Sequence, residues 1–163
     1  MPRIYVSIGS NIEREKNIRG AIRALKTRFA SVTASPVYRT EAEGFDGDDF
    51  YNLVAAFDTD EPLERVRDAL AEIEAAHGRV RPGPRYAPRT LDIDILLYGD
   101  LIRHDGQFDI PRPEIVRHAH VLGPLAMLAP AARHPETGER FADLWRRLGQ
   151  TNALREVALK LDR

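Results

Sequence analysis

The sequence predicts one α+β domain covering residues 1–163, with a mostly antiparallel sheet and helices packed on it. Two segments with apolar residues at helical spacing lie among four segments with strand character. The length of 163 residues is typical of a single domain. The hydrophobic fraction of 43% and the charged fraction of 30% are those of globular proteins.

The N-terminal half begins with a strand over residues 4–8, where Ile4, Val6 and Ile8 alternate with other residues. Residues 9–11 (Gly-Ser-Asn) are expected to end this strand in a turn and to cap the next helix. That helix covers residues 13–29 and is amphipathic. A second strand is predicted over 32–40, with Pro36 at an edge or bulge, and the acidic stretch 41–49 is predicted to be a solvated loop.

The second half repeats this order. A strand over residues 50–59 precedes a helix that Pro62 opens and Gly78 ends. Residues 79–88 contain three prolines and form a loop, and residues 91–98 form the fourth strand. The order strand, helix, strand, strand, helix, strand is that of a ferredoxin-like sandwich, with both long helices on one face.

A C-terminal extension follows this core. We expect a small hairpin over residues 101–110, irregular chain at 111–113, and a short buried helix or turn from residue 120 to 130. Residues 141–148 are predicted to form a helix with Trp145 and Leu148 facing inward, and the tail from residue 152 a weak helix or strand.

Composition limits the classes of function. The chain has no cysteine, which excludes a disulfide scaffold and thiolate metal sites and fits a cytoplasmic protein. No stretch approaches the roughly 18 apolar residues of a membrane helix. With 24 Lys and Arg against 25 Asp and Glu, the formal charge of −1 gives no overall attraction for nucleic acid. We expect a monomer without nucleic-acid or membrane partners.

The most informative motif is the acidic strand around Asp92 and Asp94. Side chains at positions i and i+2 of a strand share a face, so both carboxylates project together while Leu91, Ile93 and Ile95 pack behind them. Two adjacent carboxylates repel each other unless a hard cation lies between them, and oxygen ligands alone favour Mg²⁺. The alternative is an ordinary solvent-facing strand.

An arginine-rich loop precedes this strand, with Arg79, Arg81, Arg85 and Arg89 in a Pro- and Gly-rich segment. Guanidinium groups bind phosphate oxygens in pairs, and a loop can fold them over a polyphosphate. The alternative is a solvated loop with local ion pairs. Beside the two carboxylates, the loop predicts a site for a metal–nucleotide complex and phosphoryl-type transfer.

Residues 85–96, which read RYAPRTLDIDIL, resemble the signature of the 6-hydroxymethyl-7,8-dihydropterin pyrophosphokinase family of folate biosynthesis. Supporting matches are Glu74 and residues 6–11, 38–40, 51–52, 78–81 and 121–125. The resemblance implies the ferredoxin-like fold and transfer of the β,γ-diphosphate of ATP to the hydroxymethyl group of a reduced pterin, with release of AMP.

The resemblance also implies roles for individual residues. Two Mg²⁺ ions would be held by Asp92 and Asp94, with ATP as co-substrate. The residues implied in catalysis are Arg79, Arg89, Asp92 and Asp94. Those implied in ATP binding are Glu74, Arg79, Arg81, Arg85, Tyr86, Arg89, Arg112 and His118. Those implied in pterin binding are Thr40, Phe50, Asn52 and His120.

The chain departs from the family pattern at several of these positions. Arg112 stands where a phosphate-facing histidine is usual, His118 where an arginine is usual, and His120 where the aromatic pterin partner is usual. Glu41 and Glu43 place two acids in the loop beside the pterin. Three alternatives therefore stay open: a paralogue for a different reduced pterin, a catalytically weakened ligand-binding protein, and a nucleic-acid-binding module.

Overall fold

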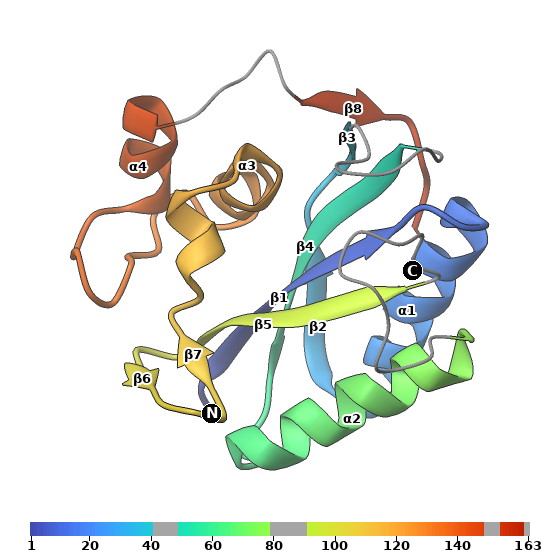
Figure 1. The fold of residues 1–163 in the computed structure, drawn as a ribbon, viewed down its shortest axis with the longest axis horizontal. Coiled ribbons are helices and arrows are strands. Elements are labelled where there is room, and N and C mark those ends of the chain that lie inside the picture. The colour runs from blue at the N-terminus through green and yellow to red at the C-terminus, as the bar shows by residue number, and fades with distance from the viewer. Residues whose placement is uncertain (41–48, 79–90, 149–153, 162–163) are drawn as a thin grey trace.

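A computed structural model describes residues 1–40, 49–78, 91–148 and 154–161. It has three layers, with α1 and α2 on one side of a six-stranded sheet and α3 and α4 on the other (Figure 1). All pairings in the sheet are antiparallel. The predicted α+β class, the antiparallel sheet and the placement of both long helices on one face are confirmed.

The strand order is β5-β1-β4-β3-β8, and β2 also pairs with β4. The strands of this sheet are β1 (Arg3–Ser10), β2 (Ala30–Ala34), β3 (Val37–Thr40), β4 (Phe50–Asp58), β5 (Asp92–Tyr98) and β8 (Arg155–Val157). The helices are α1 (Arg14–Arg28), α2 (Leu63–Ala76), α3 (Ala119–Leu128) and α4 (Phe141–Leu148). The predicted hairpin forms as β6 (Arg103–His104) and β7 (Asp109–Ile110), followed by the 3-10 helix η1 (Pro113–Val116).

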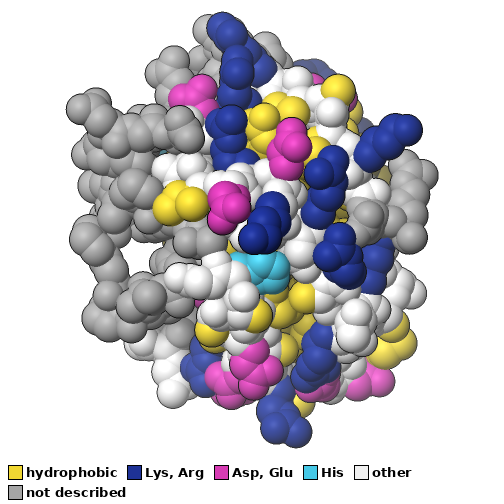
Figure 2. Space-filling view, turned by 90° about the vertical axis from the view of Figure 1, so that its right-hand side faces the viewer, with side chains coloured by type: hydrophobic (Ala, Val, Ile, Leu, Met, Phe, Trp, Pro, Cys, Tyr) yellow, Lys and Arg dark blue, Asp and Glu magenta, His cyan; other side chains and the backbone are white. Residues whose placement is uncertain are grey.

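The larger core lies between the sheet and the two long helices. Helical spacing brings Ile18, Ile22 and Leu25 of α1 to one stripe, and all three are almost fully buried. They pack with the buried residues of the strands, among them Ile8 and Ile93. The polar side of α1 carries Arg14, Lys16, Arg19, Arg23, Lys26 and Arg28. Figure 2 shows that basic side chains outnumber acidic ones on this side of the molecule.

A second core lies on the opposite face, under α3 and α4. Val54 of β4 and both Leu96 and Leu97 of β5 belong to it. Two consecutive strand residues normally face opposite ways, but the register between β1 and β5 shifts at Tyr5/Val6 and this irregularity lets both leucines turn to the same side. The C-terminal extension therefore completes the sandwich.

Three local expectations were wrong. The strand predicted over residues 32–40 is broken at Ser35 and Pro36, because Pro36 cannot donate to the ladder and the Ser35 hydroxyl accepts a hydrogen bond from the Val54 backbone at 3.0 Å instead. Residues 9 and 10 belong to β1 rather than to a turn. The residue at the N-cap of α1 is Glu13, in a left-handed conformation without a side-chain cap.

The third wrong expectation concerns the residues that face inward from the last helix, α4. Its inward residues are Phe141 and Leu144, which are fully buried. Trp145 is partly buried against them, whereas Leu148 at the helix end is 37% exposed. No helix among the described residues is long and apolar enough to span a membrane.

Candidate active site

The sheet register aligns three polar residues and a glycine, one from each of four strands, on one face. Asp92 of β5 lies opposite Gly9 of β1, Gly9 lies opposite Asn52 of β4, and Asn52 lies opposite Tyr38 of β3. Residues directly opposite each other in a sheet share a face. Val54, two residues after Asn52, is on this face and belongs to the core under α3. The row therefore lies on the α3 side of the sheet, beyond the end of the apolar core.

Gly9 lets the Asn52 side chain lie close against the centre of this row. A Cβ at Gly9 would lie 2.9 Å from Asn52 Oδ1, closer than real Cβ atoms approach, and 3.9 Å from the Phe50 ring. Asn52 Nδ2 donates a hydrogen bond of 2.6 Å to Thr40 Oγ1. Phe50, Asn52 and Thr40 therefore gather over Gly9, with Asp92 on the other side of the glycine.

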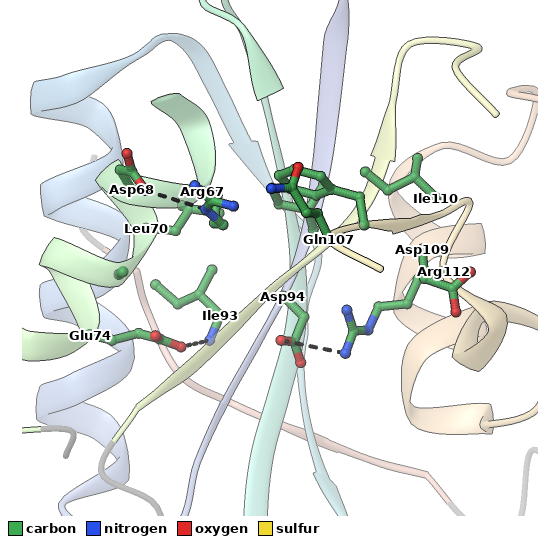
Figure 3. A pocket seen from close by; sticks show the side chains of 13 residues that line it. Arg67, Asp68, Leu70, Glu74, Ile93, Asp94, Gln107, Asp109, Ile110 and Arg112 are labelled. Atoms are coloured by element: carbon green, nitrogen blue, oxygen red, sulfur yellow. Dashed lines mark hydrogen bonds and ion pairs between the residues drawn. The ribbon is translucent and has the colours of Figure 1, made fainter. Parts of the chain in front are cut away.

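The two predicted metal ligands share a face, as expected. Along β5, Asp92 and Asp94 are partly exposed while Ile93 and Ile95 are buried. Figure 3 shows Ile93 pointing toward α2 and Asp94 pointing toward Arg112. On the α2 side of the strand, Glu74 is only 2% exposed, and its carboxylate accepts a hydrogen bond of 2.7 Å from the Ile93 backbone N–H. Glu74 thus holds the peptide group between the two aspartates.

Arg112 approaches the acidic pair from the segment after β7. Its Nη2 lies 3.8 Å from Asp94 Oδ1, and its Nε donates to Glu114 Oε2 at 2.6 Å. Burial lowers the pKa of the Arg112 guanidinium, but Asp94, Glu114 and Asp92 outweigh it and leave the pKa raised. Arg112 is therefore a permanent cation beside the predicted metal site.

A pocket of about 400 Å³ opens next to Asp94, between α2, the edge of β5 and the β6–β7 hairpin (Figure 3). Its apolar wall is formed by Leu70, Ile93, Ile95, Phe108 and Ile110. Its polar wall is formed by Arg67, Asp68, Glu74, Asp94, Gln107, Asp109 and Arg112. The volume and the mixed lining are those of small-molecule sites.

His118 and His120 stand at the start of α3. Their rings stack with centroids 5.1 Å apart and an interplanar angle of 29°. His118 is the N-cap residue of α3, and this helix packs on β4 and β3. Both imidazoles therefore come from the element that covers the same face of the sheet as Asn52.

The structure brings together two groups of predicted site residues: Glu74, Asp92, Asp94 and Arg112 along β5, and Thr40, Phe50 and Asn52 across β3 and β4. Five predicted residues lie outside the described residues, and their place in the site stays a prediction. These are Arg79, Arg81, Arg85, Tyr86 and Arg89. Glu41 and Glu43 also lie outside the described residues.

Sequence reasoning missed two parts of the site. Gly9 was interpreted as part of a turn, although a glycine within an alternating strand is a signal for close approach of another group. The hairpin wall with Phe108 and Ile110 was also missed, because no local pattern tells which element a hairpin packs on.

Asp92 and Asp94 suit Mg²⁺ better than they suit a metal ion whose ligands all come from the protein. Within residues 1–40, 49–78, 91–148 and 154–161, no group of three or more His, Asp or Glu side chains could hold a metal ion. Mg²⁺ usually takes one or two carboxylates, several waters and substrate phosphates. The donor set of Asp92 and Asp94 therefore fits an ion that arrives with a nucleotide.

Comparisons with known proteins show which family the chain is similar to. A model of the 7,8-dihydro-6-hydroxymethylpterin-pyrophosphokinase (HPPK) family matches residues 5–130. The chain is 42% identical over 141 residues to a 2-amino-4-hydroxy-6-hydroxymethyldihydropteridine pyrophosphokinase of Pseudomonas aeruginosa, covering 82% of this chain and 85% of that protein. It is 37% identical over 134 residues to the protein of that name from Methylorubrum extorquens, covering 80% and 84%.

A solved structure shows the same fold. The crystal structure of Plasmodium falciparum HPPK-DHPS with pteroate matches 90% of this chain with a TM-score of 0.71 and 12% identity, and the chain spans 44% of that protein. The family match and the curated relatives favour the pyrophosphokinase over the alternatives that the sequence left open. The chain belongs to the 7,8-dihydro-6-hydroxymethylpterin-pyrophosphokinase family, the pyrophosphokinases of folate biosynthesis.

Proposed function

We propose that this chain transfers the β,γ-diphosphate of ATP to the hydroxymethyl group of 6-hydroxymethyl-7,8-dihydropterin, with Asp92 and Asp94 as the centre of the site. The observation that carries the proposal is the register of the sheet. It puts Asp92 and Asn52 on either side of Gly9, on one face, while Asp94 borders the pocket beside β5. An acceptor over Gly9 and a nucleotide in the pocket would meet at the two carboxylates.

The pocket supports binding of the adenosine part of ATP. Its wall of aliphatic and aromatic side chains suits a flat purine. Arg112 lines this pocket beside Asp94, where a triphosphate leaving the pocket would pass. Guanidinium and phosphate form strong bidentate contacts. The loop residues Arg79, Arg81, Arg85, Tyr86 and Arg89, with His118, would complete the nucleotide site.

The metal site would consist of two Mg²⁺ ions held by Asp92 and Asp94, with phosphate oxygens and water as the other ligands. When bound, the ions would neutralise charge on the triphosphate and lower the pKa of the attacking hydroxyl. Before the nucleotide binds, Arg112 shields Asp94. The guanidinium would then turn from the carboxylate to the phosphate as ATP and Mg²⁺ enter.

The pterin would lie over Gly9. The Asn52 side chain, held by its hydrogen bond to Thr40, presents amide groups to the edge of a flat heterocycle. Phe50 and His120 would form the two stacking walls, and an imidazole can stack on a pterin as a benzene ring does. The hydroxymethyl end of the pterin would then point toward Asp92, which lies opposite Gly9 in the sheet.

The chemistry would be an in-line displacement. The pterin hydroxyl oxygen attacks the β-phosphorus, the bond from that phosphorus to the oxygen bridging to the α-phosphate breaks, and AMP leaves with that oxygen. The hydroxyl proton passes to water. Arg79 and Arg89 would stabilise the charge that spreads over the transferring group. We further propose that residues 1–163 act as one domain, as a monomer and in the cytoplasm.

An activity assay tests the proposal. Purified chain is incubated with ATP, MgCl₂ and 6-hydroxymethyl-7,8-dihydropterin, and AMP and pterin diphosphate are quantified by chromatography. We expect equal amounts of both products, a strict need for Mg²⁺, and loss of turnover in Asp94→Asn. Arg112→Gln should raise KM for ATP by about tenfold to a hundredfold, since a charge-assisted hydrogen bond contributes about 1.5–3 kcal/mol. Release of ADP instead of AMP would contradict the proposed reaction.

A further inference from the structure

The last described residues, 154–161, form a strap over the edge of the sheet that carries β3. On one face, Leu154 packs against α3 and α4: a Cβ built on Gly123 would lie 2.5 Å from Leu154 Cδ1 and 3.0 Å from the Trp145 ring. On the other face, Leu159 and Leu161 pack against the core under α1 and α2. Arg19 Nε donates a hydrogen bond of 3.0 Å to the Lys160 backbone oxygen. Between these anchors runs β8.

β8 pairs with β3, the strand that ends beside the proposed pterin site. Val157, Glu156 and Arg155 lie opposite Val37, Tyr38 and Arg39. The next residue of β3 is Thr40, whose Oγ1 accepts the hydrogen bond from Asn52. β3 has β4 as its partner on one side and β8 on the other. A displacement of β8 would therefore shift β3 and with it Thr40.

The same strap also contacts the helix that carries His120. Leu154 directly precedes β8 and fits where Gly123 of α3 has no side chain. Gly123 is in the second turn of α3, one turn after His120. Leu154 thus joins two elements, α3 with His120 and the β8–β3 pair with Thr40. The family match ends at residue 130, so this joint lies in part beyond it.

We propose that residues 154–161 are a positioning element that fixes the distance between α3 and β3, and that Leu154, seated on Gly123, is its positioning residue. The inference rests on the proposed function for one point only, that α3 and β3 are the two sides of the pterin site. The strap does not touch the substrate. It acts through His120 on one side and through Thr40 and Asn52 on the other.

Two substitutions change the contact between Leu154 and Gly123 in opposite ways. Leu154→Ala removes most of the leucine side chain and loosens this contact. Gly123→Ala adds a methyl group where Leu154 lies and pushes the two elements apart. The double variant Gly123→Ala/Leu154→Ala puts the new methyl group into the space that the leucine vacates and leaves only the tight contact of 3.0 Å with the Trp145 ring. Leu148→Ala is the matched control, because it removes the same atoms from a leucine at the exposed end of α4.

Steady-state kinetics with each substrate varied in turn give the readout. Each single variant should raise KM for the pterin by about threefold to tenfold and raise KM for ATP clearly less, because the pocket proposed for ATP lies on the β5 side of the sheet and only His118 of the nucleotide site stands on α3. The double variant should return toward the wild-type pterin KM, and Leu148→Ala should match the wild type. Equal rises in both KM values, or no rescue in the double variant, would overturn the positioning role.

Hydrogen exchange separates a failure of this inference from a failure of the proposed function. If the wild-type chain does not turn over the pterin, the proposed function is wrong, but the strap is still tested by the amides of residues 37–40. We expect faster exchange there in Leu154→Ala than in Leu148→Ala, with residues 92–98 unchanged. Unchanged exchange at residues 37–40 would overturn the inference.

Discussion

Gly9→Ala tests whether the space over this residue holds the acceptor. The added methyl carbon would meet Asn52 Oδ1 at 2.9 Å, whereas ordinary contacts begin near 3.4 Å. Asn52 must therefore move by several tenths of an ångström, and its 2.6 Å hydrogen bond to Thr40 is lost or lengthened. The backbone of Gly9 is an ordinary strand, so alanine itself introduces no backbone strain.

The size of the effect follows from the groups involved. A hydrogen bond contributes about 1 kcal/mol, and the displaced Asn52 would lose its bond to Thr40 and align poorly with the pterin. We expect pterin affinity to fall by about fivefold to thirtyfold, which corresponds to about 1–2 kcal/mol. Nucleotide affinity should stay within about twofold, because the methyl group points at Asn52 and Phe50 and not into the pocket beside β5.

Isothermal titration calorimetry measures both affinities, with the pterin titrated in the presence of a non-hydrolysable ATP analogue and Mg²⁺. Gly106→Ala is the matched control, since a Cβ at that position would meet nothing within 4 Å. Thermal unfolding of all three proteins shows whether the fold is kept. Wild-type pterin affinity in Gly9→Ala would refute the placement of the pterin over Gly9, and so would an equal loss in Gly106→Ala.

Two further predictions concern groups around the pocket. Glu74→Ala leaves the buried Ile93 N–H without its acceptor and should lower the free energy of unfolding, measured in urea, by about 1–3 kcal/mol. Glu74→Gln keeps an acceptor oxygen and should lower this free energy less. Equal losses in the two variants would contradict the role of Glu74 as the acceptor. At the hairpin, hydrogen bonding to Asp109 raises the pKa of His104 against a smaller opposing effect of burial, and Glu136 raises it further. Because the folded pKa is raised, this stabilisation is complete below the unfolded pKa of about 6.5 and is lost as the pH rises through the folded pKa. The Tm difference between wild type and His104→Gln should therefore shrink as the pH rises above about 6.5, and a constant difference would contradict the ion pairs.

The sequence predicted the features of the site that depend on local spacing. Asp92 and Asp94 share a face because side chains in a strand alternate, and Ile93 and Ile95 are buried behind them for the same reason. The amphipathic stripe of α1 was predicted equally well, because three or four residues separate neighbours on a helix face. These patterns need no knowledge of the rest of the chain.

Features that depend on contacts between distant segments could not be predicted in this way. The pairing of Gly9 with both Asp92 and Asn52 follows from the strand order, which no local spacing encodes. The role of Glu74 depends on α2 lying against the outer edge of β5. Apolar spacing also predicted that Leu148 faces inward, but α4 ends at this residue and leaves its side chain 37% exposed.

The resemblance to a family supplied the substrates, which physical patterns alone did not. Two carboxylates near several arginines indicate a metal–nucleotide site, but they do not distinguish a pterin from another hydroxyl acceptor. The departures at Arg112, His118 and His120 are all compatible with the described geometry. Arg112 reaches the acidic pair, and the two imidazoles stack at the start of α3.

The most direct test is the Mg²⁺ dependence of nucleotide binding. Calorimetry of a non-hydrolysable ATP analogue with and without MgCl₂ is compared between the wild type and the variants Asp92→Asn and Asp94→Asn. We expect Mg²⁺ to tighten binding to the wild type by about tenfold or more and to have little effect on either variant, while both variants keep the wild-type Tm within a few degrees. An undiminished Mg²⁺ effect in both variants would contradict the assignment of the two carboxylates as the metal site.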